Sequence, residues 1–377
     1  MATLNYLTTT HIDFGARSML ADTLKQLGIK RPMIVTDKGI VAAGILDKAR
    51  EAMGNEFAPE VFDGTPENPT EEATLEALKQ YQDAGCDGVV SLGGGSSMDL
   101  AKGLALLATH KGPLTQYAAI EGGGALIGDM APHIAMPTTA GTGSEVSVGS
   151  VIITQDGRKL IFASQKMLPN VAICDPELTL GLPARLTAAT GMDAVTHCIE
   201  AVLSPIENPP AEAVGLDGLR RAVKLGYLER AVADGQDRDA RYNMMMAASE
   251  GAMAFIKGLG AVHSMSHACG RVKELRLHHG TLNAVILPTI LRYNEGHVGD
   301  KYERIRDAMG LAPNADLAEA IEAINAKLGM PKNLGEMGVS MNTPGIVENA
   351  LTDVSTFTNP RPLEASDYEK LFEQAIG

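Results

Sequence analysis

The chain's length, composition and charge restrict its architecture and its partners. It has 377 residues, of which 45% are hydrophobic and 21% charged, a profile typical of a globular protein too long for one ordinary domain. Its net charge of −14 would repel phosphate backbones and anionic lipid headgroups, so neither nucleic acid nor a membrane is expected as a partner.

The first half of the sequence alternates predicted strands and helices. Strands are expected at 33–36, 61–62, 87–92 and 133–136, and helices from about residue 38 to 53, from 68 to 84 and from 96 onward. Asn68 is expected to cap the second helix, with Pro69 in its first turn and Glu71 completing a capping-box pattern. A hairpin is expected around Asp156-Gly157. This alternation predicts a mostly parallel sheet covered on both faces.

The sequence changes character near Pro183, where strand signals become rare. Helices are expected at 211–231, 239–255 and 315–327, and a loop between helices at 205–210. The sequence therefore predicts an α/β domain over residues 1–183 and an all-helical domain over residues 184–377.

The first residues and the cysteines favour a cytoplasmic protein. The opening sequence lacks the basic and apolar segments of a signal peptide, and no apolar run reaches the length of a transmembrane helix. The four cysteines are far apart and lie among apolar residues, which favours reduced and buried thiols.

Two polar loops follow predicted strands and suit a phosphate group. Gly93-Gly94-Gly95-Ser96-Ser97 precedes a helix, so its backbone N–H groups and the positive end of that helix can approach a pyrophosphate. The segment 137–144, rich in Thr and Gly, follows the next strand. Because open α/β sheets bind ligands at the carboxyl ends of their strands, both loops are expected to line one crevice. Ordinary strand-to-helix turns are the alternative, since the first loop is not GxGxxG.

Asp37 ends the first predicted strand. A carboxylate there can accept hydrogen bonds from an adenosine ribose and repel the extra phosphate of NADP, which favours NAD. In the common dinucleotide fold the acidic residue follows the glycines, whereas Asp37 precedes them. A turn or helix-capping Asp is the alternative interpretation.

Carboxylate and imidazole side chains gather in three segments of the helical half. Asp193 and His197 are four residues apart, as are His263 and His267, so each pair shares one face of a helix. His278 and His279 follow in the third segment. Mixed His and Asp ligands suit iron, zinc or cobalt. A buried, hydrogen-bonded histidine is the alternative for any one of them, and spacing alone does not select the ligands.

Jointly these motifs resemble the iron-containing (group III) alcohol dehydrogenases. The matching segments are 93–102, 137–145, 175–176, 191–200, 263–267 and 279–284, and their order and rough spacing match along most of the chain. The resemblance implies an N-terminal nucleotide-binding domain, a helical C-terminal domain and a cleft between them. It also implies, by analogy, a homodimer or larger assembly.

The resemblance assigns roles to particular residues. It implies a divalent metal, iron in this family with zinc possible, held by Asp193, His197, His263 and His279. It implies a substrate-side role for His267. It implies an NAD site formed by Gly94, Gly95, Ser96, Thr138, Thr139 and Thr142, with Lys159 near the cofactor.

One segment departs from the family pattern. The chain between His263 and His279 is slightly longer than usual and ends in a doubled histidine. His279 is the preferred ligand because it directly precedes Gly280, as the family's ligand does, and His278 is the alternative. Some relatives, the maleylacetate reductases, work without metal, but competent residues fill all four ligand positions here.

The expected reaction is direct hydride transfer between NAD(H) and a small alcohol, aldehyde or ketone. The metal would act as a Lewis acid on the substrate oxygen. His267, one helical turn from His263, would relay a proton or hydrogen-bond the substrate.

Arg271, Lys273 and Arg276 bear on a non-redox alternative, an enzyme like dehydroquinate synthase, which needs basic residues around its substrate phosphate. These side chains either meet an anionic substrate or form a solvated helix face, and the solvated face is the preferred interpretation. A metal-stabilised binding protein without turnover is a further alternative, which consumption of NADH would distinguish.

Overall fold

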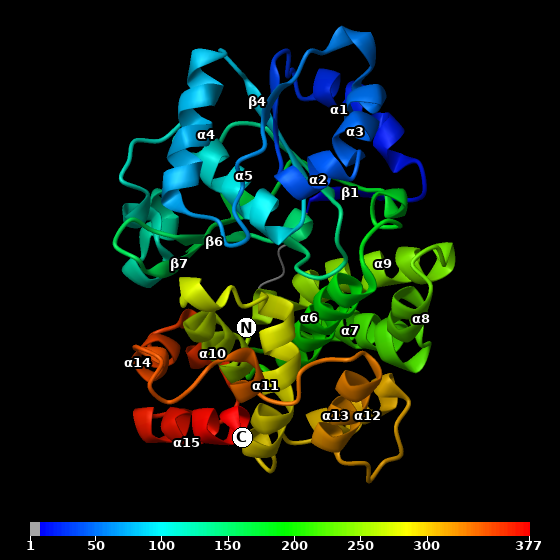
Figure 1. Cartoon of the computed structure of the whole chain (residues 1–377), viewed down its shortest axis with the longest axis vertical. Coiled ribbons are helices and arrows are strands. Elements are labelled where there is room, and N and C mark those ends of the chain that lie inside the picture. Colours follow the sequence, from blue (N-terminus) through cyan, green and yellow to red (C-terminus); the bar gives the residue numbers. More distant parts are fainter. Residues whose placement is uncertain (1–7) are drawn as a thin grey trace. The chain divides into compact units, whose positions relative to one another are not determined.

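Strands and helices segregate along the chain in the computed structural model, which describes residues 8–377 apart from the side chain of Lys273. Among these residues, one unit holds 8–139 and 143–181, and the other holds 140–142 and 182–377. Figure 1 shows a sheet with helices in the first unit and helices in the second. The long segment of the second unit begins at residue 182, and the short segment 140–142 also belongs to that unit.

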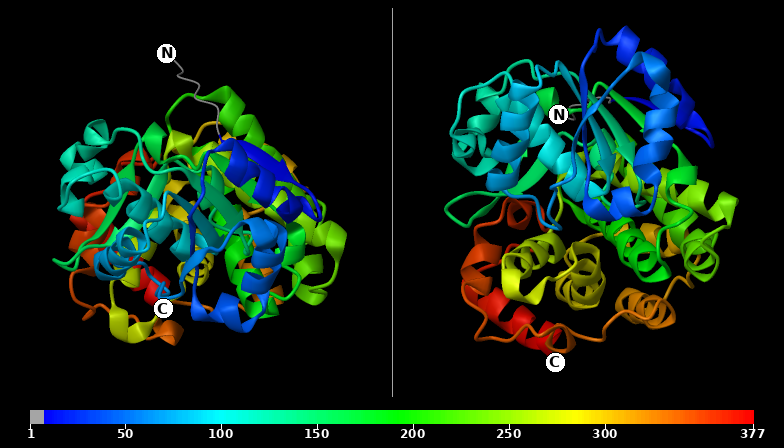
Figure 2. Two further views of the ribbon diagram at one scale, coloured as in Figure 1. Left: turned by 90° about the horizontal axis from the view of Figure 1, so that it is seen from above. Right: turned by 45° about the horizontal axis from the view of Figure 1, so that its top comes forward.

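The first unit contains a six-stranded parallel sheet (Figure 2). Its strands are β1 (Thr9–Ile12), β2 (Pro32–Val35), β3 (Glu60–Phe62), β4 (Gly88–Gly93), β5 (His133–Pro137) and β8 (Val171–Cys174), in the order β1-β8-β5-β4-β2-β3. The expected hairpin is present as β6 (Gly149–Ile153) and β7 (Lys159–Ala163), which pair antiparallel. The sequence did not predict β1 or β8, which occupy one side of the strand order.

Helices cover both faces of the sheet, as predicted. They are α1 (Leu20–Gln26), α2 (Lys38–Ala42), α3 (Ile45–Met53), α4 (Glu71–Asp83) and α5 (Gly95–Leu107). Successive strand residues point to opposite faces, so Ile34 packs in a core with α1 and α3, whereas Met33 and Val35 pack in a core with α4 and α5. The predicted fold class, a parallel α/β domain followed by a helical domain, is confirmed.

Two predicted helix boundaries in this unit were wrong. Thr70, not Asn68, caps α4, because the Thr70 hydroxyl accepts the Ala73 N–H at 3.2 Å. The helix expected over 38–53 is two helices, because Gly44 adopts the left-handed conformation at φ 71° and ends the first of them.

The second unit consists of helices around the buried α6 (Ala184–Leu203), which packs against α7, α9 and α11. The others are α7 (Pro209–Leu219), α8 (Tyr227–Ala233), α9 (Arg238–Ala254), α10 (Ala261–Gly270), α11 (His279–Asn294), α12 (Lys301–Met309), α13 (Leu317–Lys327), α14 (Ile346–Leu351) and α15 (Ala365–Ile376). Among the described helices, none combines the length and the apolar character needed to cross a bilayer.

Two predictions for the helical unit need correction. The single helix expected over 211–231 is divided into α7, a π-helix (Arg220–Lys224) and α8, because Gly226 is left-handed at φ 72°. The loop expected at 205–210 ends earlier, since Asn208 caps α7 and Pro209 opens it.

Candidate active site

One face of α6 presents three acidic or imidazole side chains. Asp193, His197 and Glu200 follow one another at intervals of four and three residues, which places them on one side of the helix. All three are at least 96% buried. Ionisable side chains are rarely buried to this extent unless they are paired or bind a metal.

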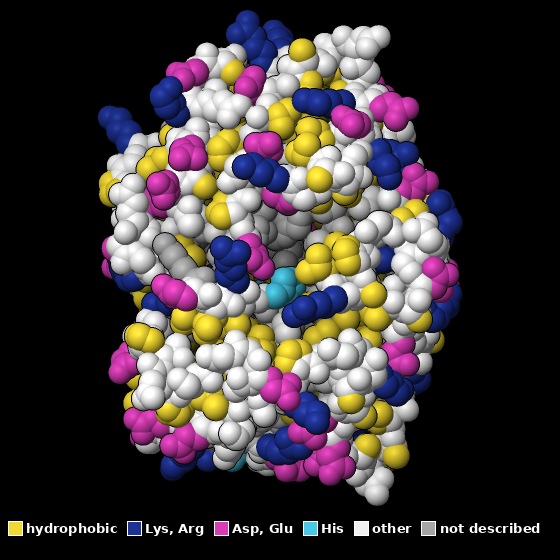
Figure 3. Space-filling model, in the orientation of Figure 1, with side chains coloured by type: hydrophobic (Ala, Val, Ile, Leu, Met, Phe, Trp, Pro, Cys, Tyr) yellow, Lys and Arg dark blue, Asp and Glu magenta, His cyan; other side chains and the backbone are white. Residues whose placement is uncertain are grey.

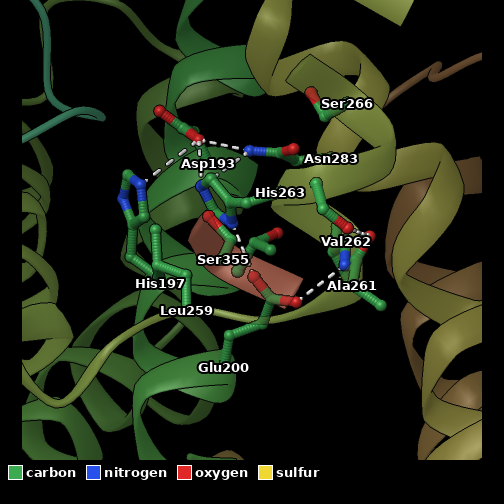
Figure 4. Close-up of polar contacts among 12 residues, drawn as sticks. Asp193, His197, Glu200, Leu259, Ala261, Val262, His263, Ser266, Asn283 and Ser355 are labelled. Carbon is green, nitrogen blue, oxygen red and sulfur yellow. Dashed lines mark hydrogen bonds and ion pairs between the residues drawn. The ribbon is translucent and has the colours of Figure 1, made fainter. Parts of the chain in front are cut away.

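Three imidazoles converge on the Asp193 carboxylate, and Figure 4 shows two of them, those of His197 and His263. The distances to Asp193 Oδ1 are 3.8 Å from His197 Nε2, 3.9 Å from His263 Nε2 and 3.6 Å from His279 Nε2. His263 lies on α10 and His279 begins α11, so three helices supply the set. Asp193, His197 and His263 offer ligand atoms that all lie within 4.8 Å of one another.

Hydrogen bonds on the far side of the rings fix which ring nitrogens face Asp193. His263 Nδ1 lies 2.6 Å from Glu200 Oε2, and His279 Nδ1 lies 2.9 Å from the Ser266 hydroxyl. Because Glu200 as a carboxylate only accepts, His263 Nδ1 carries the proton and Nε2 offers a lone pair. Burial opposes protonation of His263, but the hydrogen bond and charge of Glu200 raise its pKa. Burial lowers the pKa of His197 to about 4, which keeps that ring neutral.

The amide of Asn283 lies where the Asp193 carboxylate and the imidazole nitrogens converge. Its Nδ2 donates to Asp193 Oδ1 at 2.7 Å and lies 3.2 Å from His263 Nε2 and 3.1 Å from His279 Nε2. The NH₂ group of Asn283 therefore lies within hydrogen-bond distance of one carboxylate oxygen and two imidazole nitrogens. A set of one carboxylate and three imidazoles directed at one point suits a divalent transition metal, so the residues present fit such an ion.

The structure also distinguishes the two adjacent histidines. His279 directs Nε2 toward Asp193, whereas His278 is the residue that precedes α11 at its N-cap. The geometry therefore favours His279 over His278 as a ligand.

His267 stands beside this cluster rather than within it. Its Nδ1 lies 2.9 Å from Asp353 Oδ2, and its ring stacks on His279 with centroids 5.2 Å apart. Burial would raise the pKa of Asp353, but the neighbouring His267 and the hydrogen bonds to Ser355 hold it at about 2. The ionised Asp353 thus fixes the orientation of the His267 ring and leaves Nε2 for other partners.

The two polar loops leave adjacent strands at the same edge of the sheet. Gly93 at the end of β4 is in register with Pro137 at the end of β5. Thr138 N donates to Gly93 O at 3.0 Å, and a Cβ on Gly94 would lie 3.3 Å from Thr139. Gly94 is the N-cap of α5 and brings no side chain to its N–H groups.

The remaining predicted cofactor residues each have their own hydrogen-bond partner or position in the fold. Asp37 caps α2 by accepting the Ile40 N–H at 3.0 Å, and its Oδ2 lies 3.7 Å from where a Cβ would stand on Gly93. Lys159 Nζ donates to Asn68 Oδ1 at 3.1 Å. Gly95 and Ser96 open α5, and Ser96 donates to Glu67 O. Thr142 belongs to the segment 140–142, which is part of the helical unit.

The segment between α10 and α11 only partly matches a solvated helix face. Arg276 is exposed, and it is left-handed at φ 46°. Arg271 is only partly exposed, and its Nη1 donates to Asn349 Oδ1. The side chain of Lys273 lies outside the described residues.

Four residues that contact the predicted site residues were missed as functional residues. Glu200 follows Asp193 by seven positions and Asn283 follows His279 by four, so helical spacing could have identified both. Ser266 gave no comparable signal. Asp353 is 86 residues from His267, and only the folded chain brings the two together.

The parallel α/β unit is followed by a helical unit that contains a convergent Asp–His site, which is the donor set of a metal-binding enzyme. Residues 8–176 match the family described as iron-containing alcohol dehydrogenase, and residues 187–376 match the C-terminal part of the Fe-containing alcohol dehydrogenase family. The chain therefore belongs to the iron-containing alcohol dehydrogenases, as the motifs predicted.

Named relatives span the whole chain. It is 54% identical over 386 residues to 4-hydroxybutyrate dehydrogenase of Cupriavidus necator, with 100% of each chain covered. It is 34% identical over 378 residues to NAD-dependent methanol dehydrogenase of Bacillus methanolicus, with 96% of each covered. A solved 1,3-propanediol oxidoreductase superposes with a TM-score of 0.92 at 35% identity, covering 99% of this chain and 100% of that one. The prediction of an enzyme, an oxidoreductase acting on alcohols, is confirmed.

Proposed function

We propose that the chain transfers a hydride between NAD(H) and a small alcohol or aldehyde, with Fe²⁺ held by Asp193, His197, His263 and His279. The observation that carries this proposal is the convergence of three imidazole nitrogens on one buried carboxylate oxygen. Membership of an iron-containing family favours iron over zinc. Bound there, the ion would supply Lewis-acid polarisation of the substrate oxygen.

The surrounding residues prepare the site for this chemistry. Glu200 bonds the outer nitrogen of His263 and keeps that ring in the tautomer that can bind an ion, and Ser266 bonds the outer nitrogen of His279 and orients its ring. His267, oriented by Asp353, exchanges the hydroxyl proton with the substrate. These side chains are held by packing and hydrogen bonds, and all but Asp353 lie on helices, so little reorganisation precedes the reaction.

The cofactor is proposed to bind at the polar loops of the α/β unit. Gly94, Gly95 and Ser96 at the start of α5 would face the pyrophosphate, and Thr138, Thr139, Thr142 and Lys159 would complete the site. The buried Thr138 hydroxyl, which has no hydrogen-bond partner among the described residues, supports a polar ligand there. Asp37, close to Gly93, would bind the adenosine ribose and select NAD over NADP.

The substrate class is proposed from the relative that shares most with the chain among those named above. At 54% identity over the full length, 4-hydroxybutyrate dehydrogenase supports a short hydroxycarboxylate or the corresponding aldehyde acid as substrate. In the oxidative direction the alcohol carbon gives a hydride to NAD⁺ and its hydroxyl gives up a proton, which yields the aldehyde, NADH and H⁺.

Organisation and location are part of the same proposal. Residues 1–183 would form the nucleotide-binding domain and residues 184–377 the metal-binding and catalytic domain. The four free thiols support a reducing compartment such as the cytoplasm. Figure 3 shows acidic and basic side chains interspersed on one face, which supports small molecules rather than nucleic acid as partners. A homodimer is proposed from the family resemblance, and light scattering would test it.

The test is consumption of NADH and of NADPH by the purified enzyme against a panel of short aldehydes with and without a terminal carboxylate. Oxidation of NADH in preference to NADPH is expected. Failure to oxidise either cofactor with any aldehyde of the panel would reject the proposal.

A further inference from the structure

Helix α10 and its C-cap residue carry three polar side chains at regular spacing. His263 and His267 lie on α10, and Arg271 is its C-cap residue with helical backbone angles, so neighbours in this row are about 6 Å apart along the helix axis. His263 Nε2 faces Asp193, and His267 is the residue proposed to exchange a proton with the substrate. Arg271 thus continues, by one more turn, the row that begins at the candidate metal site.

A single neighbouring segment holds the last two side chains of the row. Arg271 Nη1 donates to Asn349 Oδ1, and His267 Nδ1 bonds Asp353 Oδ2 at 2.9 Å. Asn349 lies on α14, which packs against α10 (Figure 1), and Asp353 follows two residues after that helix. The two hydrogen bonds therefore lie side by side, because His267 and Arg271 are four residues apart and so are their partners Asn349 and Asp353. The Cα atoms of His267 and Arg271 are about 6 Å apart, which is one helical turn.

We propose that Arg271 binds the carboxylate of the substrate and thereby selects short hydroxycarboxylates over uncharged alcohols. The inference rests on the proposed function and assigns one of its specificity determinants to a residue. A guanidinium has five N–H donors in a planar fork, so it can hold the Asn349 oxygen and a carboxylate together. Asn349 would act as a positioning residue, which fixes the fork without adding charge.

The separation fits a four-carbon substrate. With C–C bonds of about 1.5 Å, the first and fourth carbons of an extended chain lie roughly 4 Å apart, and the terminal oxygens lengthen this by about 1 Å at each end. The total is close to the one-turn spacing between His267 and Arg271. The carboxylate would sit at Arg271 while the hydroxyl-bearing carbon reacts beside His267, and the carboxylate itself takes no part in the hydride transfer.

The test compares 4-oxobutanoate with butanal, which has the same four-carbon chain without the charge, as substrates for NADH oxidation. For Arg271→Ala, kcat/KM for 4-oxobutanoate is expected to fall about 10- to 100-fold, mainly through KM, the range for a lost charged hydrogen bond. With butanal it is expected to change less than about twofold, since no carboxylate contact is lost. Arg276→Gln is the matched control, because it removes the same charge from an exposed side chain of the same segment.

Further variants and outcomes complete the test. Arg271→Lys keeps the charge and the alkyl stem but loses the planar fork, so kcat/KM for 4-oxobutanoate should fall less than in Arg271→Ala, while kcat/KM for butanal stays unchanged. This variant keeps the inference testable if Arg271→Ala does not fold. An unchanged ratio of the two kcat/KM values in both Arg271 variants, or an equal change in Arg276→Gln, would overturn the inference. A wild-type enzyme that favours butanal would overturn it while leaving the proposed oxidoreductase in place. A wild-type enzyme that oxidises NADH with neither aldehyde would overturn both.

Discussion

Glu200 offers the sharpest perturbation of the candidate metal site, because its carboxylate serves two donors at once. Oε2 lies 2.6 Å from His263 Nδ1, and Oε1 accepts the Val262 N–H at 2.8 Å near the start of α10. Glu200→Gln keeps the size of the side chain but replaces one acceptor oxygen with an NH₂ donor. That donor must face either the imidazole or the backbone N–H, both of which are donors in the wild type.

The magnitude follows from these two contacts. If the NH₂ faces His263, Nδ1 must become the acceptor, the proton moves to Nε2, and the nitrogen directed at Asp193 can no longer bind an ion. If the NH₂ faces Val262, a buried N–H loses its acceptor, at a cost of about 1–3 kcal/mol. Changes to groups that orient metal-binding histidines typically weaken metal affinity 10- to 100-fold, and a loss of that size is expected here.

Metal affinity is best measured by competition with a chelator of known affinity, using folded protein checked by circular dichroism. Glu250→Gln is the matched control, since Glu250 is another buried carboxylate of the helical unit and bonds Arg221 rather than a proposed ligand. Its metal affinity should stay within about twofold of the wild type, because no proposed ligand loses a partner. A folded Glu200→Gln variant that binds metal as tightly as the wild type would refute the positioning role of Glu200.

Three further predictions concern catalysis, cofactor choice and pH. His267→Asn should retain the bound metal but lower kcat at least about 100-fold, the usual contribution of a positioned proton donor or acceptor, and unchanged turnover would contradict it. Asp37→Ser can still cap α2, so it should fold normally and raise the NADPH-to-NADH ratio of kcat/KM, whereas an unaltered ratio would exclude Asp37 from cofactor selection. Burial raises the pKa of Glu250 from 4.5 to about 7. Below pH 4.5 the side chain is protonated in both states and does not destabilise the fold, but as pH rises through 7 the folded state must bury a carboxylate and stability is lost. Glu250→Gln should therefore raise the free energy of unfolding at pH 8 by at most about 3 kcal/mol, with little effect at pH 4.5. Urea unfolding of variant and wild type at both pH values measures this effect, and the same difference in unfolding free energy at the two pH values would contradict it.

Sequence patterns predicted the parts of the fold that depend on local periodicity. The run at 87–92 and the glycines after it gave β4 and the start of α5, and the spacing of Asp193 and His197 placed both on one face of α6. Helical periodicity could not show that Gly44 and Gly226 interrupt their helices, because each flanking sequence is compatible with helix and the break depends on a left-handed glycine.

The partners of the site residues were harder to predict for a related reason. Asp353 and Asn349 lie 86 and 78 residues from the side chains they bond, and nothing in their local sequence marks them. Spacing did contain the signal for Glu200 and Asn283, but a carboxylate or amide one or two turns from a ligand can equally face elsewhere. Hydrogen bonds, rather than spacing, therefore assign these residues to the site.

The most direct test of the proposed metal site is NADH oxidation with a short aldehyde before and after chelation, followed by separate addition of Fe²⁺ and Zn²⁺. The four-residue site predicts that activity disappears with the metal and returns with one of the two ions, Fe²⁺ being expected, and that His279→Ala neither retains metal nor recovers activity. Activity that is indifferent to complete metal removal would contradict the account and would leave Asp193, His197, His263 and His279 as structural residues.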